Sequence, residues 1–133
     1  QGRIAIEWLP QTVEEFFIHN RGFEGEFDCS KLPAQLKECI ASCNRLTGTL
    51  CLSDLPPKLR IINLWKNFLV GSVDLRRIPE KLEFLAVHSN NLVGPLVLNP
   101  ETSLTHLFVS CNQLNGVIDY TDLPRHIQEV DFG

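Results

Sequence analysis

Three of the four histidines in the chain lie at related places in a repeating pattern, and histidine is the residue best suited to proton transfer near neutral pH. His19 and His88 share one place in the pattern, and His106 lies four places earlier in a later copy. Ser110 occupies the place of His88 in the next copy, so these two side chains could pair as a base and a nucleophile. No carboxylate is placed to orient the imidazole, and no oxyanion donors are apparent. We therefore predict no enzymatic activity and expect the histidines on a binding surface.

Three aspartates also recur at one place in the pattern, but only in alternate copies. Asp28, Asp74 and Asp119 would then lie about 10 Å apart from one to the next, which is too far to share a metal ion. We expect each to accept hydrogen bonds from its own backbone at a turn. No set of cysteines and histidines has zinc spacing, and no glycine-rich loop could cradle a phosphate. The sequence predicts neither a metal nor a cofactor.

The five cysteines leave at least one thiol that is free or pairs between chains. Cys29 and Cys39 take places of core residues, and Cys51 takes an outward place. Cys43 and Cys111 share a place but are three copies apart, about 14 Å, which is too far for a disulfide. No Asn-x-Ser/Thr sequon is present. These features favour an intracellular location over a cell-surface or secreted one.

All of these residues belong to a pattern that repeats every 23 residues, with one step of 22. Each copy reads L-x-x-L-x-L-x-x-N-x-L-x-G, with substitutions, and a fixed period in this range is typical of a stacked-repeat solenoid. No copy can bury its apolar side alone, so the array is stable only as a stack. The copies begin at Val13, Leu36, Leu59, Leu82, Leu104 and Ile127.

The unit L-x-x-L-x-L-x-x-N-x-L resembles the leucine-rich repeat, and the resemblance covers nearly the whole chain. The last third of each unit reads Gly-x-(Val/Leu/Ile)-x-Leu and then a Leu-Pro pair such as Leu55-Pro56, which is similar to arrays in protozoan parasites. The resemblance implies a solenoid with a curved parallel β-sheet on the concave side. It further implies loops and short 3-10 turns on the convex side, with little α-helix.

The residues themselves support that architecture. Alternating leucines predict one short strand per copy, and the glycine at the thirteenth place permits a tight bend. The asparagine at the ninth place has donors and an acceptor that can satisfy buried backbone groups between turns. We therefore predict a structural ladder whose loss, as in Asn67→Ala, destabilises the fold without altering a binding surface. The ladder consists of Asn44, Asn67, Asn90 and Asn112.

Composition excludes some partners. The net charge of −4 and the absence of a Lys/Arg stripe argue against nucleic acid, and no apolar run is long enough for this segment to insert into a membrane. The pattern fills residues 1–133 as a single domain. Ile4 and Ile6 look like the tail of an earlier unit, so we expect a fragment of a longer array. Its open ends would be covered by a partner or by self-association.

The strand places that the core does not use should line an exposed concave surface. Its middle is apolar and aromatic, with acidic residues at both ends, and an exposed apolar patch of this kind usually marks an interaction site. Aromatic residues at the centre of such a patch are the usual energetic anchors. The predicted partner-binding residues are Ile40, Ile61, Asn63, Trp65, Phe84, Ala86, His88, His106 and Phe108.

We therefore predict a non-enzymatic protein–protein interaction module that binds a protein or peptide on its concave face. A surface receptor or adhesin ectodomain is one alternative, which the parasite-like pattern favours. A substrate-recognition domain of a larger enzyme, such as a ubiquitin ligase, is another. A fold of this kind supports many functions, so the choice depends on the site.

Overall fold

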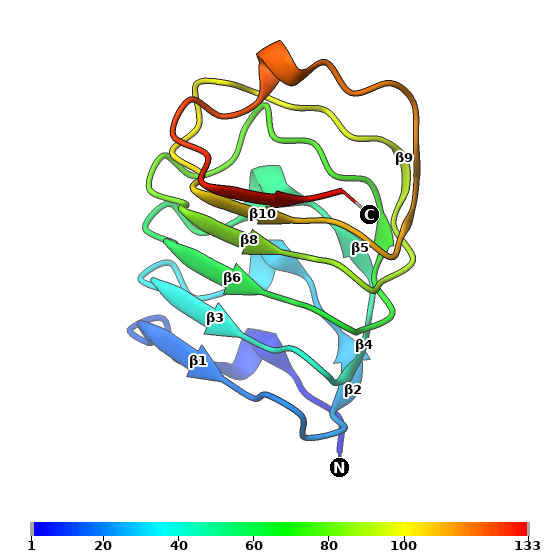
Figure 1. Cartoon of the computed structure of the whole chain (residues 1–133). Coiled ribbons are helices and arrows are strands. Elements are labelled where there is room, and N and C mark those ends of the chain that lie inside the picture. The colour runs from blue at the N-terminus through cyan, green and yellow to red at the C-terminus, as the bar shows by residue number, and fades with distance from the viewer. Residues whose placement is uncertain (1, 133) are drawn as a thin grey trace.

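The chain forms a stacked series of turns in a computed structural model that describes residues 2–132. One six-stranded sheet runs along the whole stack, and every neighbouring pair in it is parallel (Figure 1). Each strand begins two residues after the start of a repeat, so one short strand per copy is confirmed. In spatial order the strands are β1 (Glu15–Phe17), β3 (Glu38–Ile40), β6 (Ile61–Asn63), β8 (Phe84–Ala86), β10 (His106–Phe108) and β12 (Glu129–Asp131).

The repeat period sets the register of this sheet. Ile61 pairs with Phe84, and Phe84 pairs with His106, so residues at one place in the repeat form a column across the strands. The middle residue of each inner strand points into the core, as Ile62 and Leu85 do with no exposed surface. Because strand side chains alternate, the first and third residues of each strand must lie on the opposite face.

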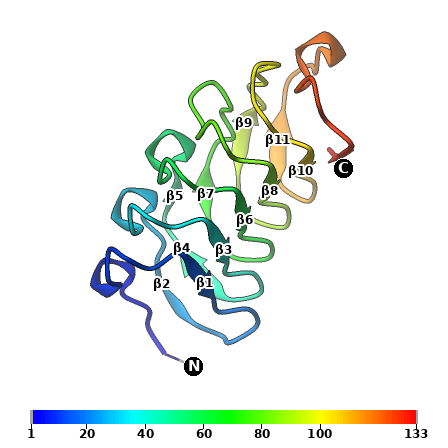
Figure 2. The same ribbon diagram turned by 90° about the vertical axis from the view of Figure 1, so that its left-hand side faces the viewer.

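Three further parallel ladders of two strands each lie along another side of the turns (Figure 2). The sequence predicted loops and short 3-10 turns outside the main sheet, and it did not predict these ladders. Adjacent extended segments there satisfy their backbone groups by pairing with each other, in a register shifted by two places from the repeat. The pairs are β2 (Glu24–Glu26) with β4 (Arg45–Thr47), β5 (Thr49–Leu50) with β7 (Val70–Gly71), and β9 (Val93–Pro95) with β11 (Gln113–Asn115).

Short 3-10 helices complete the turns on the side away from the main sheet, and no α-helix occurs among residues 2–132. Asp28 and Asp119 each accept a hydrogen bond from the backbone N–H two residues on, at the start of a 3-10 helix. Asp74 does the same toward Arg76, so the predicted turn role of the three aspartates is confirmed. The helices are η1 (Ile6–Trp8), η2 (Cys29–Lys31), η3 (Leu52–Asp54) and η4 (Tyr120–Asp122).

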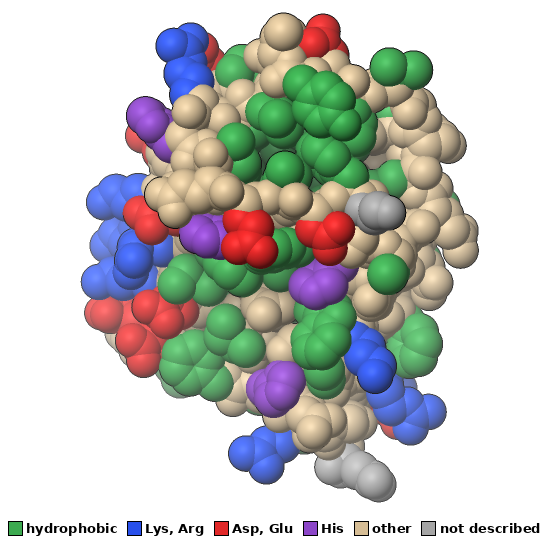
Figure 3. Space-filling view, viewed as in Figure 1, with side chains coloured by type: hydrophobic (Ala, Val, Ile, Leu, Met, Phe, Trp, Pro, Cys, Tyr) green, Lys and Arg blue, Asp and Glu red, His purple; other side chains and the backbone are tan. Residues whose placement is uncertain are grey.

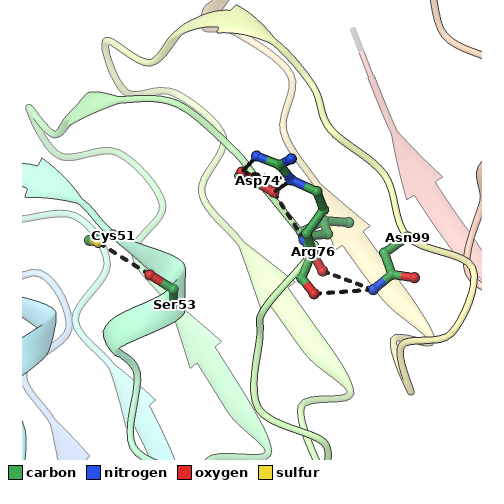
Figure 4. A network of polar contacts seen from close by, with 6 residues as sticks. Cys51, Ser53, Asp74, Arg76 and Asn99 are labelled. Carbon is green, nitrogen blue, oxygen red and sulfur yellow. Dashed lines mark hydrogen bonds and ion pairs between the residues drawn. The ribbon is translucent and has the colours of Figure 1, made fainter.

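The two turns without a 3-10 helix are held by polar contacts instead (Figure 4). The guanidinium of Arg76 donates to both carboxylate oxygens of Asp74, with the shorter ion pair at 2.7 Å. The amide of Asn99 donates to the backbone carbonyls of Leu75 and Arg76, one repeat earlier. Asp74 and Arg76 border a hollow of about 450 Å³ together with Cys51 and neighbouring residues. Because the two charged side chains pair with each other, their role is structural.

Four asparagines link the turns through the interior. Asn44 Nδ2 donates to the carbonyl of Ile18 in the previous turn and to that of Ala41 in its own turn, and its Oδ1 accepts from two backbone N–H groups. Asn67, Asn90 and Asn112 repeat the arrangement one turn further on each time. Each side chain therefore satisfies backbone groups that the turn would otherwise leave unpaired.

Two buried thiols belong to the core rather than to a reactive site. Burial raises the pKa of Cys29 to about 11 and that of Cys39 to about 12, so both stay protonated near neutral pH. Cys43, Cys51 and Cys111 are at least partly exposed, and all five thiols are free. Within residues 2–132, no helix is long and apolar enough to cross a bilayer.

Gly25→Ala should destabilise the fold by about 1–3 kcal/mol, because a side chain would be forced into a backbone conformation that only glycine readily adopts. Gly25 has φ of +127°, and a Cβ there would come within 2.8 Å of the carbonyl oxygen of Ile4. Gly94 has φ of +83°, so alanine there has a similar backbone cost, but its Cβ would meet nothing closer than 3.9 Å. Gly94 is therefore the matched comparison for the clash at Gly25. Urea denaturation should show a smaller loss for Gly94→Ala; equal losses would contradict the steric argument.

Candidate interaction surface

The open side of the six-stranded sheet carries the predicted binding residues, and we call it the sheet face. It consists of the first and third residues of each strand, together with the residue two places after each strand. Figure 3 shows hydrophobic and histidine side chains gathered over these strands, with acidic side chains beside them. Row by row it contains Glu15, Phe17, His19; Glu38, Ile40, Ser42; Ile61, Asn63, Trp65; Phe84, Ala86, His88; His106, Phe108, Ser110; and Glu129, Asp131.

An aromatic cluster occupies the centre of the sheet face. The rings of Trp65 and His88 stack with centroids 5.4 Å apart and an interplanar angle of 16°. Phe108 lies 5.7 Å from His88 and 5.6 Å from Phe84, and Phe84 also stacks on His106 at 5.6 Å. These separations suit attractive aromatic pairs, so the cluster is a preformed and partly exposed apolar surface.

Most of the predicted binding residues are partly exposed on this face, but Ala86 is not. Ala86 has no exposed surface, which contradicts its predicted place among the exposed partner-binding residues. Its neighbours in the column are Asn63 and Phe108, whose larger side chains cover a methyl group between them. Conversely, Phe17 is 56% exposed and was not among the predicted residues. The sequence could have identified Phe17, because it occupies the same place in the repeat as Phe108.

The pairing of His88 with Ser110 as base and nucleophile, against which the sequence argues, is not present. The hydroxyl of Ser110 donates to the carboxylate of Asp131 at 2.7 Å. The Nδ1 atom of His88 is buried and has no hydrogen-bond partner among the described residues. Elsewhere on the face, His19 Nδ1 and the hydroxyl of Ser42 lie 2.6 Å apart. The histidines therefore pack within the surface instead of forming a relay.

His88 should make the stability of the protein depend on pH. Burial lowers the pKa of His88, and this outweighs the opposing effect of the Asp131 charge. The unfolded chain therefore binds a proton at higher pH than the folded chain does, and stability is lost as pH falls through and below the unfolded pKa of about 6.5. Between pH 8 and pH 5, the melting temperature should fall further for the wild type than for His88→Gln. Equal drops would contradict this assignment.

A shallow hollow of about 360 Å³ lies beside Trp65, where the chain leaves the sheet. In five successive turns, the residue directly after the last sheet-face residue adopts a left-handed backbone conformation, with φ between 54° and 61°. It is the residue at which the chain turns away from the sheet. The hollow is lined by His19, Asn20, Cys43, Asn44, Trp65 and Lys66.

Two solved structures with the same architecture come from receptor kinases. The ectodomain of the receptor kinase SOBIR1 from Arabidopsis thaliana superposes with a TM-score of 0.69 and 24% identity, covering 87% of this chain and 67% of that one. The chain has the leucine-rich repeat fold. The structure of Pollen Receptor Kinase 3 superposes with a TM-score of 0.72 and 24% identity, covering 92% of this chain and 61% of that one. No protein-family model and no curated protein sequence matches the chain.

The leucine-rich repeat fold separates the residues that build the solenoid from those that line the sheet face. The leucines, asparagines and glycines that define the repeat lie in the core or at its turns, so they build the solenoid. The sheet-face residues differ from copy to copy, and nothing in the fold demands an aromatic side chain there. The resemblance to protozoan arrays is a separate matter that these superpositions do not address.

Proposed function

We propose that this leucine-rich repeat domain is a non-enzymatic interaction module that binds a protein or peptide on its sheet face, the concave side of the solenoid. The observation that supports it best is the aromatic cluster of Trp65, Phe84 and Phe108, which is partly exposed although the fold does not require it. Clustered aromatic side chains at the centre of a surface are the usual anchors of interfaces. The hollow beside Trp65 adds a recess that can accept a side chain of the partner.

A receptor ectodomain is the second candidate, and the comparisons favour it. Both superposed structures belong to receptor kinases, and the chain spans 67% and 61% of their lengths. This candidate differs from the first only in what the module is attached to, because a receptor also needs a surface that recognises its ligand. The use of the sheet face is therefore common to both.

Site-specific photocrosslinking tests the choice of surface. A photoreactive phenylalanine analogue replaces Phe84 on the sheet face in one protein and Phe68 in another. Phe68 is 52% exposed and borders a hollow with residues of β2 and β4, away from the sheet face. We expect a crosslinked partner from the Phe84 position and not from the Phe68 position. Crosslinks of equal yield from both positions, or from Phe68 alone, would contradict the proposal.

A further inference from the structure

The sheet face contains acidic residues but no lysine or arginine. Four of the 16 acidic residues of the chain lie on it, and none of the 12 lysines and arginines does. The remainder of the molecule therefore has twelve acidic and twelve basic residues, so the net charge of −4 resides on this one surface. The four acidic residues are Glu15, Glu38, Glu129 and Asp131.

The surrounding basic side chains neutralise only part of this charge. Arg60 lies 3.8 Å from Glu38 and 3.9 Å from Glu83 at one border of the face. Among the described residues, no lysine or arginine forms an ion pair with Glu15 or Glu129, and both are exposed. The negative potential is therefore strongest toward the two ends of the sheet.

The C-terminal end places this charge directly beside the aromatic cluster. Glu129 pairs in register with His106, and Asp131 pairs in register with Phe108, on adjacent strands. The hydroxyl of Ser110 holds the carboxylate of Asp131 on this face at 2.7 Å. A flat aromatic ring next to carboxylates is the arrangement that a guanidinium recognises, because it can lie over the ring and donate hydrogen bonds to the oxygens.

We propose that the occupant of the sheet face is a cationic polypeptide segment. An arginine or lysine side chain of the segment lies over Phe108 and pairs with Glu129 and Asp131, while an apolar side chain packs against Trp65 and Phe84. This inference rests on the proposed function and adds the chemistry of the partner to it. The charge complementarity favours a basic segment over a second copy of this chain, whose own sheet face is acidic.

The strand spacing sets the distance between the two partner side chains. From β12 to β6 there are three strand steps, or about 14 Å, which an extended segment spans in about four residues. Side chains four residues apart point to the same side of an extended chain. The partner segment therefore carries its basic residue about four residues from a large apolar one.

Selection from a random library of 12-residue peptides displayed on phage tests this proposal. We expect the selected peptides to be enriched in arginine or lysine about four residues from Leu, Phe or Trp. Fluorescence polarisation should then show binding about tenfold weaker to the Glu129→Gln/Asp131→Asn protein, because charged hydrogen bonds are lost. The control Glu80→Gln/Asp54→Asn removes the same charge from exposed positions off the sheet face and should change affinity by less than about twofold.

The outcomes separate this inference from the proposed function. Peptides that lose binding to Trp65→Ala, but show no basic enrichment and bind the Glu129→Gln/Asp131→Asn protein normally, would overturn the cationic partner and leave the sheet face as the site. Peptides that bind Trp65→Ala as tightly as the wild type would overturn both. Failure to select any peptide would overturn the proposal of a linear cationic segment. Circular dichroism of each variant confirms that it is folded.

Discussion

Replacing Asn67 with alanine should lower the free energy of unfolding by about 3 kcal/mol, which for a chain of this size lowers the melting temperature by about 10 °C. Asn67 is 5% exposed, and its Nδ2 donates to the carbonyls of Ala41 at 3.0 Å and Leu64 at 3.1 Å. Its Oδ1 accepts from the backbone N–H of Leu46 at 3.1 Å. Alanine would leave the buried N–H of Leu46 without its partner. It would also remove one of the two asparagine hydrogen bonds that each of the Ala41 and Leu64 carbonyls accepts, so the loss affects two successive turns.

Asn91 provides the control for this substitution. It is an exposed asparagine at the place that follows the ladder, so Asn91→Ala tests the loss of an asparagine side chain without the loss of the ladder. Differential scanning calorimetry should show a large shift for Asn67→Ala and a negligible one for Asn91→Ala. An unchanged melting temperature for Asn67→Ala would show that the ladder does not stabilise the fold.

The repeat period makes most of the fold predictable from the sequence. Leu82 and Leu85 recur in every copy as apolar residues, and a stack in which they share one core has little freedom in strand order or register. The five glycines at the thirteenth place all have positive φ, as their tight bends require. Periodicity thus specifies the direction of each side chain as well as the path of the backbone.

Periodicity does not specify how much of a side chain its neighbours cover. Ala86 points to the sheet face as predicted, yet it is buried because the residues beside it are larger. Ser42 is buried in the same way, at 1% exposed. The hydrogen bond from Ser110 to Asp131 likewise joins residues of different copies that no repeat rule relates. These features depend on which side chains meet across the sheet, which only the structure shows.

Trp65→Ala should weaken binding of the partner by at least about 2 kcal/mol, or about 30-fold in Kd, because Trp65 is the largest side chain in the aromatic cluster. The Trp65 ring contacts His88 on the sheet face, whereas the hydrogen bonds of Trp65 are made by its backbone. Its carbonyl accepts from the N–H of Cys43, and its N–H donates to Asn63. Alanine keeps both. The substitution should therefore remove binding surface while the solenoid persists, so affinity and stability respond separately.

The affinity of the crosslinked partner for three proteins tests the assignment of the sheet face most directly. The proteins are the wild type, Trp65→Ala and Phe68→Ala, the last of which removes an exposed aromatic side chain away from the sheet face. Isothermal titration calorimetry should give a Kd about 30-fold higher for Trp65→Ala and within about twofold of the wild type for Phe68→Ala. A folded Trp65→Ala protein that binds as tightly as the wild type would contradict the account.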